Sequence, residues 1–364
     1  MGKKVFKDVK VLKLDVSFRG VGAVNNDGGH QKFALREAGL IKGQVNDNVV
    51  FSKKNIYMDE EGKYYFKAKV SSECIRHDMF IEEAEFHNTE GALIDEILYG
   101  IIAQPAMIER GYMEATSFRA LKKRSPVSIS DAEGISRHYT VMTDLCTRSG
   151  KKESSSAEGE TAEEALGKRG GTNLYYKESI GEEVYLSTGF IDLTEMQFIS
   201  ADDNYDRNAI CADEGSTQER IYLDNIKKNF GPDHRFGFYY MKQGLTKDEW
   251  AERGILLNKE AVDFMTKDVI RRIMQVSIRR RGSHFVFNSI RITVNTLDNP
   301  EGEVIEIQNL EDIYNYQFEY FEKYLEADEE LIKKNRDLCE KNKKDEADRR
   351  AEKKAAKKSA KDKK

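Results

Sequence analysis

The chain has 364 residues, with 59 basic and 64 acidic side chains and a net charge of −5. That length predicts one large domain or two ordinary ones, and no run approaches eighteen apolar residues, so no transmembrane helix is expected. Residues 341–364 contain 12 basic and 5 acidic residues, so this tail carries +7 and the rest of the chain carries −12. An acidic body argues against nucleic-acid binding over the whole surface, but it permits local basic clusters.

Cysteine and motif patterns exclude several classes of site. The four cysteines form no CxxC pair, and the first residues lack the apolar core of a signal sequence. We therefore expect no disulfide framework, no zinc site and a reducing cytoplasm as the compartment. Phosphate-loop, hydrolase-elbow and zinc-protease motifs are missing, and Gly20-Val-Gly22 lacks the third glycine of a dinucleotide loop. No cofactor, metal or enzymatic activity is predicted.

The first half of the chain begins with a clear strand pattern. Apolar residues alternate from Leu12 to Phe18, which predicts a half-buried strand leading into a Gly/Asn-rich loop over 20–29. A hairpin is predicted between 55–58 and 64–70. Ser71 or Ser72 then begins a helix. A second helix is predicted from 89 to about 109, with Pro105 bending or ending it.

The second half alternates between strands and helices. Residues 148–171 are rich in Ser, Glu and Gly, which predicts a long insertion. A hairpin is predicted between 174–181 and 184–188, followed by a strand over 190–199. Further on, we predict a helix over about 258–274, strands over 285–287 and 290–294, and a charged helix over about 310–344. The Lys/Ala tail has no apolar stripe and is expected to be disordered or a solvated helix.

Three basic clusters are candidate binding sites. The first surrounds the Ser71-Ser72 helix start, where free backbone N–H groups and nearby cations suit a phosphate, although a capped surface helix is an equally plain explanation. The second precedes Pro126, and the third lies between a helix and a strand, where it either neutralises phosphates or complements a helix dipole. The cations concerned are Lys67, Lys69, Arg76 and His77; Arg119, Lys122, Lys123 and Arg124; and Arg279, Arg280 and Arg281.

Taken in order, these segments resemble a known family. The strand, the Gly/Asn loop and the run from Lys67 to His77 are similar to the start of the CRISPR-associated backbone subunits of type I surveillance (Cascade) complexes, which belong to the RAMP superfamily. Segments 110–112, 123–126, 172–176 and 189–198 are similar to subtype F and its variants. The resemblance covers roughly residues 8–300, and the tail after about 325 is not part of it.

The resemblance implies a fold and a function. The fold is α+β, with a ferredoxin-like (RRM-like) palm over 1–325, a finger-like insertion at about 30–70 and a web or thumb insertion at about 112–188. The charged tail, 326–364, is expected to be helical and then disordered. The thumb lies either within 112–147 or in the hairpin 172–188, which we slightly favour. Copies of such subunits polymerise head to tail along guide RNA, together with other subunits, and leave the bases free to pair with target DNA.

The resemblance also implies roles for particular residues. It places Lys69, Ser71, Ser72, Arg76 and His77 on guide phosphates and the run from Arg119 to Arg124 along the groove or thumb. An alternative is a RAMP-type ribonuclease in which Asp27 assists metal-dependent RNA cleavage, although an Asp before Gly is also a common turn residue. Another RAMP branch cleaves guide repeats with a histidine base, for which His77 and His284 are the candidates.

Overall fold

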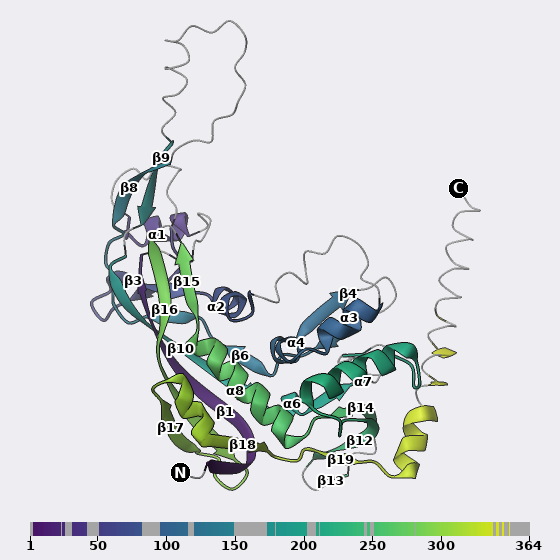
Figure 1. Cartoon of the computed structure of the whole chain (residues 1–364). Coiled ribbons are helices and arrows are strands. Elements are labelled where there is room, and N and C mark those ends of the chain that lie inside the picture. Colours follow the sequence, from purple (N-terminus) through teal and green to yellow (C-terminus); the bar gives the residue numbers. More distant parts are fainter. Residues whose placement is uncertain are drawn as a thin grey trace, which may run out of the picture.

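The computed structural model describes residues 3–22, 24–25, 31–41, 51–81, 95–115, 120–148, 173–178, 180–201, 209–210, 212–243, 246–247, 251–280, 282–337, 340–341, 344–345 and 349. The fold is mixed α/β, built around a large, curled and mainly antiparallel sheet with helices packed on one face (Figure 1). Within the described residues, no helix is both long and apolar enough to cross a membrane.

The main sheet has ten strands. Seven of them follow one another in the order β15 (Ser277–Arg280), β16 (Ser283–Thr296), β1 (Lys4–Val21), β10 (Glu182–Asp192), β7 (Ala132–Gly134), β3 (Tyr64–Val70) and β2 (Lys54–Met58). The other three attach at the sides: β17 (Glu303–Ile307) to β16, β18 (Tyr316–Tyr320) to β1, and β6 (Val127–Ile129) to β10. β18 runs parallel to β1, whereas the other strand pairs of this sheet in the described residues are antiparallel.

Smaller elements surround this sheet. A second sheet contains β11 (Phe198–Ser200), β14 (Glu252–Leu256), β12 (Phe236–Gln243), β13 (Thr246–Lys247) and β19 (Tyr324–Glu326). Two separate hairpins pair β4 (Tyr112–Ala115) with β5 (Ala120–Lys123) and β8 (Thr143–Arg148) with β9 (Asn173–Glu178). The helices are α1 (Lys32–Glu37), α2 (Ser72–Met79), α3 (Asp95–Ile102), α4 (Pro105–Arg110), α6 (Leu193–Met196), α7 (Thr217–Phe230), α8 (Lys259–Met274) and the 3₁₀ turn η2 (Leu310–Asn315).

β1 is the central element of the core. Its alternating residues Leu12, Leu14, Val16 and Phe18 are buried, as the sequence pattern predicts, but the strand is longer than the predicted 12–18. The Phe18 ring stacks on Phe285 of β16, with ring centroids 4.6 Å apart. Because β1 is paired along both edges, its backbone N–H and C=O groups are satisfied within the sheet. On the buried face, α6 packs against β1, and α8 packs against β16 and β18.

Several other predictions are confirmed. The hairpin β2–β3 and the helix beginning after Ser71 lie where the sequence places them. α8 matches the predicted helix over about 258–274, since the Asn258 side chain caps it and its apolar stripe faces β16 and β18. Pro105 does interrupt the predicted helix over 89–109, because it occupies the first turn of a new helix, α4. Residues 89–94 lie outside the described part of the chain.

Two pairings correct the predictions for the region around 174–199. β9 pairs with β8, not with the strand that follows it, so the expected hairpin between 174–181 and 184–188 is wrong. The following segment instead joins β1 as the long strand β10. The strand predicted over 190–199 is also interrupted, because the Asp192 carboxylate accepts hydrogen bonds from Thr194 and Glu195 N–H and begins α6.

The C-terminal third differs from the prediction in two places. Residues 285–287 and 290–294 form one strand, β16, with a register shift opposite Ser17 and Phe18 where two strands were expected. Residues 310–326 are not a helix: η2 is followed by β18 and β19, and Phe318 and Tyr320 alternate into the core. A helical stretch over 329–337 does follow, with Leu331 buried.

The cap of α8 provides a test of this packing. Replacing Asn258 by alanine removes the side-chain oxygen that accepts from Ala261 N–H at 2.8 Å. We expect the free energy of unfolding to fall by about 1 kcal/mol, the usual cost of a lost N-cap, as measured by chemical denaturation. The matched control is Asn315→Ala, which alters an exposed asparagine and should cost less than about 0.5 kcal/mol. Equal losses in the two variants would contradict the capping role.

Candidate nucleic-acid interface

The end of β1 and the turn of the β15–β16 hairpin meet at close range. Val21 pairs with His284, and Gly22 N–H donates to the Ile180 carbonyl at 2.7 Å. Gly22 has φ +72°, and a Cβ at this position would overlap the Ser283 hydroxyl. Glycine is required here both for its backbone conformation and for the close approach.

The next residues of this loop connect β1 to the start of α2. The Asn25 side-chain N–H donates to the Ser71 hydroxyl at 2.9 Å, and both residues are buried. The Asn25 carbonyl accepts from Lys53 N–H at 2.8 Å, and the Lys53 carbonyl in turn accepts from Lys69 N–H. The Gly/Asn loop, the Ser71-Ser72 helix start and the hairpin turn are therefore brought together by the fold.

The N-terminus of α2 already binds a carboxylate of the protein itself, that of Asp131. Ser72 N–H donates to one carboxylate oxygen of Asp131 at 2.8 Å, and Lys69 Nζ lies 2.9 Å from the other. Desolvation by burial would raise the pKa of Asp131, but the hydrogen bonds from Ser72 and Lys69 outweigh it and lower this pKa below its usual value. An RNA phosphate at this helix end would have to displace a stable carboxylate.

Arg76 is turned toward the protein. Its guanidinium donates to the Val127 carbonyl at 2.7 Å and to the Arg110 carbonyl at 2.8 Å, and it contacts the Ser125 hydroxyl at 3.3 Å. Burial, and secondarily the charge of Arg110, lower the pKa of Arg76. In this arrangement Arg76 fastens α2 to the segment that leads into β6.

Other predicted cations face solvent at the same end of the sheet. Arg279 and Arg280 are exposed on β15, next to the hairpin turn, and His77 is exposed on α2. The Asp78 carboxylate accepts from Ser277 N–H at 2.8 Å, which fixes β15 against α2. Arg281 lies outside the described residues.

Two further basic residues come from other parts of the chain: Lys53 directly precedes β2, and Arg280 belongs to β15. Burial raises the pKa of the Cys74 thiol, and the positive charges of Arg280 and Lys53 oppose this increase. Lys53 is hydrogen-bonded through its backbone to Lys69, just before α2, and Arg280 lies on β15, which packs against α2. Together with Arg279 and His77 they form what we term the cationic rim.

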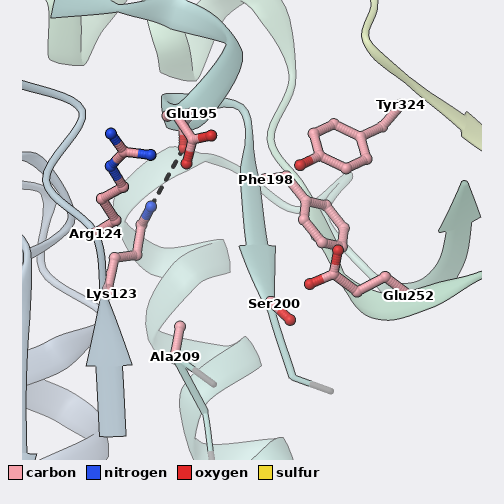
Figure 2. A pocket seen from close by; sticks show the side chains of 8 residues that line it. All are labelled: Lys123, Arg124, Glu195, Phe198, Ser200, Ala209, Glu252 and Tyr324. Carbon is pink, nitrogen blue, oxygen red and sulfur yellow. Dashed lines mark hydrogen bonds between the residues drawn. The ribbon is translucent and has the colours of Figure 1, made fainter. Parts of the chain in front are cut away.

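The second basic cluster lies elsewhere. Lys122 and Lys123 are in β5, and the hairpin β4–β5 is well separated from β15 (Figure 1). Lys123 is buried and donates to the Glu195 carbonyl at 3.3 Å, whereas Arg124 is exposed at the edge of a small hollow (Figure 2). Arg119 lies outside the described residues. The structure thus separates this cluster from the cationic rim.

The catalytic alternatives rest on Asp27, His77 and His284. Across the described ranges, no group of three His, Cys, Asp or Glu side chains is placed to hold a metal ion. Asp27 lies outside these ranges, and His284 is exposed on β16 near the hairpin turn. Sequence reasoning missed Asn25, Lys53 and Asp131, because their roles arise from contacts between segments distant in the chain.

Comparison with known families identifies the family of the chain. The family model described as "Type I-Fv CRISPR-associated protein Cas7fv-like" matches residues 9–327. The chain belongs to this family. It is thus a Cas7 protein of a type I CRISPR system, which confirms the resemblance to Cascade backbone subunits of a subtype F variant. The match runs from β1 to just past β19 and leaves the charged tail outside. No curated protein matches the chain significantly.

The close approach at Gly22 provides a test of the interface. Replacing Gly22 by alanine places a side chain at φ +72° and against Ser283, so we expect a loss of about 1–2 kcal/mol in unfolding free energy. A second change, Ser283→Gly, removes the steric overlap but not the backbone strain. The double variant should therefore recover part of the loss in chemical denaturation. No recovery at all would mean that the overlap is not the cause.

The carboxylate at the start of α2 predicts a pH dependence. The pKa of Asp131 is lower in the folded chain, so its contribution to stability is full above the ordinary carboxyl pKa and is lost as the pH falls through the folded value. Asp131→Ala should lower the unfolding free energy by about 1 kcal/mol at neutral pH, as a lost cap does. Asp131→Asn should differ from wild type at neutral pH and less so below about pH 4. Thermal unfolding across this range measures both, and a constant difference would contradict the assignment.

Proposed function

We propose that this protein is a non-catalytic subunit that binds guide RNA (crRNA), polymerises along the spacer and presents its bases for pairing with target DNA in antiviral defence. The observation that carries the proposal is membership of the Cas7fv-like family over 9–327, together with exposed arginines beside a helix start. In guided effectors, base pairing reads the sequence and the protein reads backbone and shape. Cations without base-specific partners suit that task.

The topology supports a ferredoxin-like palm. β1 lies between β16 and β10, antiparallel to both, and β6 and β7 follow beyond β10. Along the chain, α2, α3 and α4 lie between β1 and β6, and α8 lies between β10 and β16. This is the strand and helix order of a βαββαβ unit. We assign the thumb to the β8–β9 hairpin, which extends away from the main sheet in Figure 1.

Within this proposal the basic residues have two kinds of role. The cationic rim holds guide phosphates, because Arg279, Arg280 and His77 are exposed to solvent. Arg281, which follows Arg280 in the chain, is assigned the same role from the sequence. The buried or ion-paired members shape the site that the rim surrounds, namely Lys69, Ser71, Ser72 and Arg76. Arg119, Lys122 and Arg124 line a second part of the RNA path, beside buried Lys123. Successive copies contact each other through two different surfaces, which gives an open helical filament and not a closed ring.

Removing rim charges tests the proposal directly. Arg279→Ala together with Arg280→Ala should weaken binding of guide RNA to the same degree for different spacer sequences. Each lost phosphate contact should lower the slope of log affinity against log salt by about 0.7. Filter binding at several salt concentrations measures both quantities. The control is Lys227→Ala with Lys228→Ala, which removes two charges from the last turn of α7.

Three outcomes would contradict the proposal. If the arginine pair and the lysine pair lose affinity equally, the rim is not the RNA site. If RNA incubated with a divalent cation is cut by the wild type and not by Asp27→Ala, the chain is a RAMP-type ribonuclease. A change in preference for particular bases would contradict the backbone-binding model.

A further inference from the structure

The solvent-facing side of the main sheet carries large apolar side chains on a central strand. In β10, Phe190 is 45 % exposed and Leu186 is 55 % exposed, while the residues between them alternate into the core. The exposed face of an antiparallel sheet normally carries polar side chains. We term this side of β2, β3, β7, β10, β1 and β16 the open face. Phe190 and Leu186 thus each leave about half of their surface to solvent on this face.

The surroundings of Phe190 are polar and include a cation. By strand register it lies between Lys13 of β1 and Ser128 of β6. One step along the strand, Thr188 pairs with Asp15. Lys13 and Asp15 are 3.3 Å apart, but both are more than a third exposed, so their ion pair is weak and easily rearranged. The strand positions around this aromatic ring thus carry an ammonium group, the carboxylate paired with it, and hydroxyls.

Aromatic rings recur on the same face toward its edge. Leu186 pairs with Glu133 of β7, and Glu133 pairs with Lys69 of β3. Because every second residue of a strand lies on the same face, Tyr65 of β3 also belongs to the open face. Tyr65 stacks on Tyr57 with ring centroids 5.5 Å apart, and the Arg137 guanidinium lies 5.0 Å from the Tyr65 ring. Following the pairs Leu186–Glu133 and Glu133–Lys69, Phe190 and Tyr65 lie two strand spacings and eight residues apart, about 28 Å. The open face therefore carries a second aromatic position, the 38 % exposed Tyr57 beside the buried Tyr65, several nucleotides away from Phe190.

We propose that the open face binds single-stranded nucleic acid, with a base stacked on Phe190 and phosphates near Lys13 and Arg19. Proteins that bind single strands combine aromatic platforms with cations, and four-stranded sheets use aromatic residues of their central strands to stack bases. Arg19 is exposed on this face, three strand positions before Gly22. β1 thus leads from Phe190 to the cationic rim, over about 30 Å. This continuity and the polar surroundings favour a nucleic acid over a protein partner.

Stacking by Phe190 is testable with a matched variant. Phe190→Ala should weaken the binding of fluorescein-labelled dT15 or rU15 to the full chain about tenfold, the effect of losing one stacked base. Phe264→Ala is the control, because Phe264 is 52 % exposed on α8, which packs on the other side of the sheet. Its affinity should stay within twofold of wild type. Fluorescence anisotropy at fixed salt measures both, and circular dichroism checks that each variant is folded.

A crosslinking experiment separates the two sources of a single strand. In complexes assembled on guide RNA and target DNA, 5-iodouracil is placed either in the guide or in the displaced DNA strand. A photocrosslink to the peptide containing Phe190 from one of them supports the proposal and identifies its ligand. Equal oligonucleotide affinities for Phe190→Ala and Phe264→Ala would overturn it. The proposal would also be overturned if Phe190→Ala kept its oligonucleotide affinity but its copies failed to assemble on guide RNA. That result would make the open face a protein interface. Neither result depends on the arginine pair that tests guide binding.

Discussion

The pairing of β1 along both of its edges is the constraint on which the rest of this structure depends. Hydrogen bonds to β10 and β16 continue to Val21, so the direction of the chain at that point is fixed by two neighbours. The loop that follows therefore arrives at the β15–β16 turn and at the start of α2. Gly22 permits the contact with Ser283, and Asn25 fastens the loop to Ser71. The cationic rim is assembled from this one meeting point.

Internal partners decide which cations remain available for a ligand. Lys69, Arg76 and Lys123 pair with a carboxylate or with backbone carbonyls of the protein, and removing them would take one partner from each of those groups. Arg279 and Arg280 lie on an edge strand near a turn, where solvent satisfies them. A basic cluster in a sequence therefore contains two populations. Only exposed members can exchange water for phosphate at low cost.

Local patterns predicted the elements better than their partners. The alternation in β1 and the capped, amphipathic α8 were clear from the sequence, because period and cap are local properties. The partner of β9 was not, since adjacency in the chain favoured β10 whereas the actual partner β8 precedes a long insertion. The charged segment 310–326 suggested a helix, yet burial of Phe318 and Tyr320 made it strands. The same limit applies to the site, where the inward turn of Arg76 depends on carbonyls 34 and 51 residues away.

The two nucleic-acid surfaces that we propose share one requirement. A subunit repeated along a guide must bind any spacer equally, so it cannot use hydrogen bonds that distinguish bases. Phosphate contacts at the cationic rim are independent of sequence. Stacking on Phe190 is tolerant of sequence as well, because every base has a flat aromatic face. A charged rim and an aromatic open face on one sheet therefore solve the same problem by different means, and sequence recognition is left to base pairing.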